Sequence, residues 1–101
     1  MNELQKKVDN LIREFGGYWE PFEMLAAAVE ELGEFSREML RYENIKEEGN
    51  REKLEEEFGD LLFTLACIAN YYDLDMCSAL DRSISKYSNR DRARWYNDQL
   101  L

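Results

Sequence analysis

Apolar residues recur at helical spacing along most of this chain. In the first segment they repeat every three or four positions, at Leu4, Val8, Leu11, Ile12 and Phe15. This spacing predicts a helix from about Asn2 to Phe15 that stops at Gly16-Gly17. No run of alternating β-branched residues indicates a strand. The hydrophobic pattern therefore predicts an all-α protein.

The second predicted helix begins at Pro21, which suits a first helical turn, and continues to about Tyr42. Its main apolar stripe follows the spacing 3, 4, 3, 4 and consists of Leu25, Ala28, Leu32, Phe35 and Met39. The segment from Asn44 to Asn50 is polar and contains Gly49, so it reads as a loop that reverses the chain.

A third helix is predicted from Arg51 to about Tyr72, and its character changes halfway. The first turns are charged, whereas every side of the stretch from Leu61 to Ala69 is apolar or small. A helix without a solvated face is buried all round. In a chain of this size, we expect a subunit interface to cover this stretch.

The residues after Tyr72 predict a fourth helix. Asp73 and Asp75 interrupt the pattern and cap a helix from about Met76 to Asn89, followed by a shorter helical or frayed tail to Leu101. We expect residues 1–101 to form one domain with a four-helix-bundle-like fold. Because a domain of this length leaves much surface incompletely buried, a homodimer or homotetramer is expected.

Charge and composition exclude several classes of function. The net charge is -9 and comes entirely from residues 1–60, with 17 acids and 8 bases, whereas residues 61–101 hold 5 of each. The acidic half should repel a nucleic-acid backbone, so no polymer partner is expected. The absence of histidine excludes Ser-His-Asp catalysis and histidine-ligated zinc. The remaining ligands are mostly oxygen, which suits Mg²⁺ or Mn²⁺.

No targeting or membrane segment is apparent in the sequence. The first ten residues lack an apolar signal-peptide core, and the longest apolar stretch is far shorter than the roughly 20 residues of a membrane helix. Cys67 and Cys77 lack the spacing of a metal-binding pair, and reduced thiols are favoured over a disulfide between them. These observations predict a soluble cytoplasmic protein without a membrane partner.

A carboxylate pattern occurs twice. Glu31-Leu32-Gly33-Glu34 and Glu57-Phe58-Gly59-Asp60 each place two acids three residues apart, with a glycine before the second. Residues at i and i+3 share a helix face, where like charges repel. If two antiparallel helices pack closely at these glycines, four carboxylates converge on one pocket that only cations would make tolerable.

The simpler interpretation is a solvated acidic surface. At about 100° per residue, Glu31 and Glu34 lie away from the centre of the apolar stripe of their helix. Considered without the second pair, they would be read as solvated side chains. Glu57 and Asp60 weigh against this interpretation, because they adjoin the apolar half of the third helix. Buried carboxylates must be protonated, paired or metal-bound.

The two motifs, Glu-Glu-Leu-Gly-Glu-Phe and Glu-Glu-Glu-Phe-Gly-Asp-Leu-Leu-Phe, resemble those of the MazG-like all-α nucleoside triphosphate pyrophosphohydrolases. The resemblance covers about residues 15 to 92. It implies that Glu31, Glu34, Glu57 and Asp60 bind Mg²⁺, with Mn²⁺ as a substitute, and that these residues carry catalysis. The implied reaction releases a nucleoside monophosphate and pyrophosphate. Either one of these glutamates or a neighbour, Glu30 or Glu38, would accept the proton of the attacking water.

The family pattern also supports a set of substrate-binding residues. Similar members carry a tryptophan at Trp19 and a basic helix, which here presents Arg82, Lys86 and Arg90 at i, i+4 and i+8. Salt bridges to the abundant glutamates would explain the bases equally well, and packing would explain Trp19. Ile84 stands where family members often have asparagine, and the nearest amide is Asn89.

The sequence is therefore compatible with three functions. The first is hydrolysis of a nucleoside triphosphate, as house-cleaning of non-standard or surplus nucleotides. The second is phosphoribosyl-ATP pyrophosphohydrolase-like activity, since histidine-pathway relatives resemble this layout too. The third is a catalytically silent acidic module that binds a protein partner. The four intact carboxylates favour the first.

Overall fold

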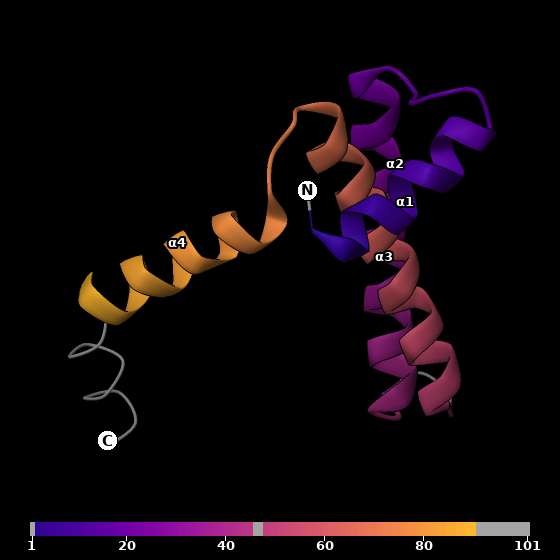
Figure 1. The fold of residues 1–101 in the computed structure, drawn as a ribbon. Helices are drawn as coiled ribbons and strands as arrows, with labels where there is room; N and C mark the ends of the chain where they lie inside the picture. The colour runs from indigo at the N-terminus through magenta and orange to yellow at the C-terminus, as the bar shows by residue number, and fades with distance from the viewer. Residues whose placement is uncertain (1, 46–47, 91–101) are drawn as a thin grey trace.

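The computed structural model describes residues 2–45 and 48–90, and within these ranges the chain forms four helices (Figure 1). They are α1 (Glu3–Glu14), α2 (Pro21–Tyr42), α3 (Arg51–Tyr71) and α4 (Met76–Arg90). The predicted all-α class is confirmed, with helix boundaries within about one residue of those expected. The tail predicted after the fourth helix lies outside the described residues.

The two long helices, α2 and α3, run antiparallel and lie side by side, and α1 packs against α3 (Figure 1). A small core joins the three helices and consists of Val8, Met24, Ala66 and Cys67. Ala66 is completely inaccessible to solvent, so a larger side chain there would force the helices apart. Cys67 is buried and Cys77 is exposed, both as free thiols.

A polar residue lies at the centre of the contact between α1 and the turn after α3. Gln5 is 1% exposed, and its Nε2 donates hydrogen bonds to Asn70 Oδ1 at 2.9 Å and to the Leu74 carbonyl at 2.7 Å. Its Oε1 accepts from the Met76 backbone N–H at 2.8 Å. These bonds tie α1 to both sides of Asp73, whose positive φ of 55° forms the turn into α4.

The predicted apolar stripe of α2 is buried only in part: Ala28 is buried and Phe35 is half-buried, whereas the other three members are exposed, contrary to the burial expected for such a stripe. Leu25, Leu32 and Met39 are 55%, 52% and 49% exposed. Met24 and Glu38, each 3% exposed, are instead among the buried residues of this helix. The orientation of α2 therefore turns part of its acidic face inward and leaves an apolar face outside.

The apolar half of α3 is covered in part. Its buried residues are Thr64, Ala66, Cys67 and Ala69. Phe63 and Leu65 remain 37% and 42% exposed. The described chain therefore covers some sides of this stretch but not all of them, and the expected cover by a second subunit stays a prediction.

The last helix, α4, extends away from the α2–α3 pair (Figure 1). Within Met76–Arg90 no residue is buried. Leu80, Ile84 and Tyr87, at i, i+4 and i+7, form an apolar stripe in which each residue is more than half exposed. No described helix is both long enough and apolar enough to cross a membrane.

Candidate active site

Three carboxylates from the two sequence motifs meet between α2 and α3. Glu31 comes from α2, and Glu57 and Asp60 come from α3. One oxygen of each lies within 4.8 Å of the others. Glu57 is buried, Glu31 is partly buried and Asp60 is exposed, so the group is open to solvent on one side. We refer to Glu31, Glu57 and Asp60 as the carboxylate cluster.

The electrostatics of the carboxylate cluster fit a bound cation. Burial, and then the negative charges of Asp60 and Glu57, raise the pKa of Glu31 above its usual value. The ionised form of Glu31 is therefore disfavoured, and a divalent cation would favour it by offsetting the repulsion from Asp60 and Glu57. Three carboxylate oxygens form a hard donor set, which suits Mg²⁺ or Mn²⁺.

Glu34, the fourth acid of the predicted set, lies beside the carboxylate cluster but outside it. It is about 60° from Glu31 around α2, at roughly 100° per residue. Its Oε2 lies 3.9 Å from Nη1 of Arg37 in a partly exposed ion pair. The structure thus brings together three of the four predicted carboxylates and pairs the fourth with an arginine.

The two motif glycines do not create the close helix contact that the sequence interpretation assigned to them. Gly33 and Gly59 are both exposed, and a Cβ added at either position would meet no atom of the described residues within 4 Å. Each lies two residues after a carboxylate, which is about 200° around the helix. Both glycines therefore face away from the carboxylate cluster.

Close approach occurs instead at Gly49, in the loop between α2 and α3. A Cβ at this position would lie 2.8 Å from backbone atoms of Arg41 and Tyr42. Because the obstructing atoms are backbone, they cannot move aside cheaply. The absence of a side chain at Gly49 thus allows the start of α3 to lie close against the end of α2.

A lysine that the sequence reasoning missed contacts the carboxylate cluster. Lys53 Nζ lies 3.3 Å from Glu57 Oε1 and 3.5 Å from Glu56 Oε2. The hydrogen bond with Glu57 and the charge of Glu56 raise the pKa of this lysine. The i, i+4 spacing of Lys53 and Glu57 on one helix was the signal that would have revealed this pair.

The two alternative proton acceptors have different environments. Glu38 is 3% exposed, and its Oε1 lies 2.6 Å from Nη1 of Arg41. This charge-assisted contact already engages one oxygen of the Glu38 carboxylate. Glu30, by contrast, is exposed on α2.

The predicted substrate-binding bases lie apart from the carboxylate cluster within one chain. Arg82, Lys86 and Arg90 are exposed on α4, which points away from α2 and α3 (Figure 1). Lys86 Nζ and Arg90 Cζ lie 4.8 Å and 5.9 Å from the centre of the Tyr87 ring. The described chain alone does not bring these bases to the carboxylates.

The two aromatic residues before α2 have different roles. Trp19 is 62% exposed, so its ring is accessible. Tyr18 instead donates a hydrogen bond to Asp9 Oδ1 at 2.6 Å and accepts one from Asn70 Nδ2 at 3.0 Å. Tyr18 therefore serves packing, and Trp19 remains the candidate for contact with a base.

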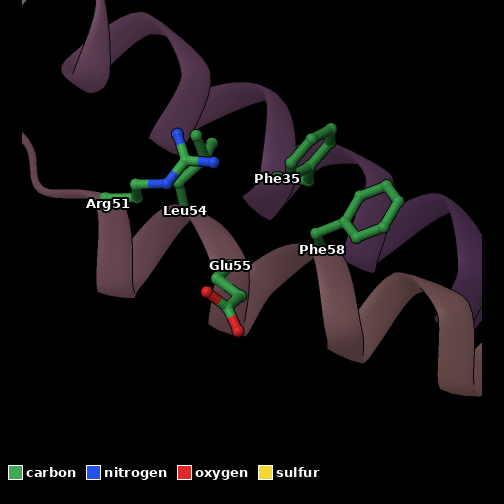
Figure 2. Close-up of a pocket in the computed structure, with 5 residues that line it drawn as sticks. All are labelled: Phe35, Arg51, Leu54, Glu55 and Phe58. Carbon is green, nitrogen blue, oxygen red and sulfur yellow. The ribbon is translucent and has the colours of Figure 1, made fainter.

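A separate groove lies along α2 and α3, with a volume of about 380 Å³. Figure 2 shows its lining, in which Phe35 and Phe58 lie beside each other with ring centres 5.4 Å apart. The other lining residues are Arg51, Leu54 and Glu55. Phe58 and Asp60 are two residues apart in α3, so their side chains are separated by about 160° around the helix axis. On α3, Phe58 thus faces away from Asp60, whereas on α2 the groove residue Phe35 is only about 40° around the helix from Glu31.

Comparison with known proteins agrees with this arrangement. The family model described as the MazG nucleotide pyrophosphohydrolase domain matches residues 20–95. The uncharacterised protein YpjD of Bacillus subtilis is 43% identical over 99 residues, which cover 94% of this chain and 89% of the relative.

Two solved structures share the fold. The crystal structure of the Bacillus-conserved MazG protein, a nucleotide pyrophosphohydrolase, superposes with a TM-score of 0.76 at 36% identity over 90% of this chain and 92% of its own. The crystal structure of YPJD from Bacillus subtilis has the same TM-score and identity, over 89% of this chain and 94% of its own. With its two carboxylate motifs converging between α2 and α3, this chain belongs to the MazG nucleotide pyrophosphohydrolase family.

Proposed function

We propose that this protein hydrolyses a nucleoside triphosphate to a nucleoside monophosphate and pyrophosphate with the aid of Mg²⁺, for which Mn²⁺ can substitute. The observation that carries the proposal is the convergence of Glu31, Glu57 and Asp60 from two helices to within 4.8 Å. The family supports the reaction class, and the donor set supports the metal.

The carboxylates have two tasks in this mechanism, which are to hold the metal and to accept a proton. Glu31, Glu57 and Asp60 would hold the metal, with Glu34 as a fourth ligand if it exchanges Arg37 for the cation. When bound, the metal supplies charge neutralisation at the phosphates and activates the attacking water. A cluster glutamate, or the exposed Glu30, would accept the water's proton. Glu38 is less suited to that task because Arg41 already binds it.

The substrate's outer phosphates would contact Arg82, Lys86 and Arg90, and its base would stack on Trp19. Because α4 points away from the carboxylates in its own chain, we propose that these bases act on the site of a second copy. The exposed apolar residues Leu25, Leu32 and Met39 offer a surface for such a homodimer or homotetramer. The single domain would act on non-standard or surplus nucleotides in the cytoplasm.

A panel of nucleotides incubated with Mg²⁺ tests the reaction, with separate assays for pyrophosphate and orthophosphate. We expect pyrophosphate as the first product from a triphosphate, poor turnover of diphosphates and no turnover with a chelator. Orthophosphate as the first product would place attack at the terminal phosphorus and refute the proposed reaction. Including a phosphoribosyl-linked nucleotide in the panel tests the alternative substrate. No turnover of any nucleotide, with or without Mg²⁺, would favour a silent binding module.

A further inference from the structure

The segment between α1 and α2 presents an exposed aromatic ring from a fixed backbone. Trp19 is 62% exposed, although tryptophan is on average a highly buried residue. Both of its neighbours in the sequence are held in place. Tyr18 is hydrogen-bonded to α1 and α3, and Glu20 caps α2. The ring of Trp19 is therefore exposed on a segment whose ends are fixed.

The Tyr18 side chain is held at both its ring and its hydroxyl. The ring packs against the core that joins the three helices. The hydroxyl donates to Asp9 Oδ1 at 2.6 Å and accepts from Asn70 Nδ2 at 3.0 Å, so it bridges α1 and α3. Asp9 is held in turn by Arg13, whose Nε donates to Asp9 Oδ2 at 2.8 Å. These contacts fix the residue immediately before Trp19.

The backbone on both sides of Trp19 allows this arrangement. Gly16 and Gly17 have positive φ values of 105° and 117°, which residues with side chains rarely adopt, and they form the turn that follows α1. On the other side, the Glu20 carbonyl accepts from the Met24 N–H at 3.0 Å, and Met24 is buried in the core. Trp19 thus lies between two residues that the core and the helix cap hold.

A ring fixed in this way is organised for stacking before a ligand arrives. An aromatic side chain on a mobile loop must be ordered when the ligand binds, and this ordering reduces the affinity. Because the segment that carries Trp19 is already held, less of that cost remains. A nucleobase has a planar π face that stacks on aromatic side chains.

We propose that Tyr18 is a positioning residue for the nucleotide: its hydroxyl, held between Asp9 and Asn70, fixes Trp19 in the orientation that stacks on the base. This inference rests on the proposed function, which assigns Trp19 to the base. Tyr18 acts through Trp19 and does not itself touch the substrate. Its hydroxyl therefore affects recognition of the base and leaves the contacts to the phosphates unchanged.

Tyr18→Phe in the full-length protein tests the proposal, because it removes the hydroxyl and keeps the ring on the core. At saturating Mg²⁺, we expect KM for the triphosphate to rise about three- to fivefold while kcat changes less than about twofold. The inhibition constant of inorganic tripolyphosphate, which has no base, should stay the same. Tyr72→Phe, at a tyrosine that is 54% exposed, is the matched control and should behave as the wild type.

A double-mutant cycle separates positioning from a merely structural role. Trp19→Ala should raise KM for the triphosphate, and Tyr18→Phe should then have no further effect, because the two residues act as one unit. A structural role of Tyr18 would give additive effects. Additive effects, an unchanged KM in Trp19→Ala, or a tripolyphosphate inhibition constant that rises with KM would each overturn the proposal.

Fluorescence tests the positioning without turnover. Trp95→Phe leaves Trp19 as the only tryptophan of the chain. In that background, Tyr18→Phe should lower the time-resolved anisotropy of Trp19 on the nanosecond scale while the circular dichroism spectrum stays the same. Unchanged anisotropy would overturn the proposal. Absence of turnover in the wild type would instead refute the proposed function, and the anisotropy would still decide whether the Tyr18 hydroxyl orders Trp19.

Discussion

Gln5 and Asn70 exchange hydrogen bonds across the contact between α1 and α3. Gln5 Nε2 donates to Asn70 Oδ1 at 2.9 Å, and Asn70 Nδ2 donates to the backbone carbonyl of Gln5 at 3.0 Å. The same Asn70 Nδ2 donates to Tyr18, whose hydroxyl donates to Asp9. A connected polar network therefore fixes how α1 sits on α3, where apolar packing alone would allow sliding.

We expect Gln5→Leu to lower the free energy of unfolding by about 3 kcal/mol, because the Met76 N–H and the Leu74 carbonyl would lose their partner. Urea denaturation followed by circular dichroism measures the change. Asn10→Leu, at an exposed position of the same helix, is the matched control and should change stability by less than about 0.5 kcal/mol. Equal stability of the two variants would contradict the role assigned to the network.

The partly buried, hydrogen-bonded hydroxyl of Tyr18 predicts a pH dependence at high pH. Burial, followed by the hydrogen bond to Asp9, raises the pKa of Tyr18 to about 12. An unfolded tyrosine titrates near about 10, so the unfolded state loses this proton first. The stability that depends on Tyr18 is therefore complete below about pH 10 and is lost as the pH rises through about 12.

Denaturation of the wild type and Tyr18→Phe at intervals between pH 8 and pH 12 would reveal this difference. The wild type should lose stability relative to the variant over that upper range, because Phe cannot ionise. Parallel curves would mean that the Tyr18 hydroxyl titrates alike in the folded and unfolded states.

The motif glycines offer a test of what covers the outer faces of α2 and α3. In the described chain, Gly33→Ala and Gly59→Ala place a methyl group in open space, so each should stabilise its helix by about 1 kcal/mol. Thermal unfolding measures the shift. Gly49→Ala is the contrasting variant and should destabilise, because its Cβ would lie 2.8 Å from backbone atoms. A destabilised Gly33→Ala or Gly59→Ala would show that another subunit packs at that glycine.

Asp60→Asn should abolish turnover without unfolding the protein. The change removes a proposed metal ligand while it relieves repulsion from Glu31, so kcat should fall by about a hundredfold or more as stability stays level or rises. Steady-state kinetics at saturating Mg²⁺ and a thermal melt test the two parts. Glu52→Gln, an exposed acid on the same helix, is the control. Wild-type activity in Asp60→Asn would remove this residue from the metal site.

Phe63→Glu should dissociate or unfold the oligomer. Phe63 is 37% exposed on the apolar half of α3, where a charge would be buried against a partner subunit. Light scattering and sedimentation at micromolar concentration give the mass of each form. Glu55→Gln, at an exposed acid of α3, should leave the assembly intact. A monomeric wild type would contradict the predicted interface.

Much of the fold follows from local sequence signals. Pro21 begins α2 and Asn50 caps α3, so the helix boundaries could be predicted from residues that act within one turn. The convergence of Glu31 with Glu57 and Asp60 was also predictable, because a repeated i, i+3 pattern on adjacent antiparallel helices leaves few other arrangements. These features depend on short-range geometry.

Features that depend on the rotation of one helix against another were not predictable. The apolar stripe of α2 predicted which face of this helix is buried, yet Leu32 on that stripe is 52% exposed. Glu38 is buried instead, and the ion pair with Arg41 compensates its charge. The direction of α4 likewise depends on Gln5, which is 71 positions before its partner Met76. Helical periodicity identifies a face but does not say which neighbour, or which subunit, covers it.

The exposed position of α4 has a consequence for its amide protons. A helix that buries none of its residues opens by local fluctuation without breaking the core, so its backbone N–H groups should exchange with deuterium long before those around Ala66. Any subunit that covers Leu80, Ile84 and Tyr87 would slow that exchange. The deuterium uptake of this one helix, followed as the protein is diluted, would thus report the dissociation constant of the assembly.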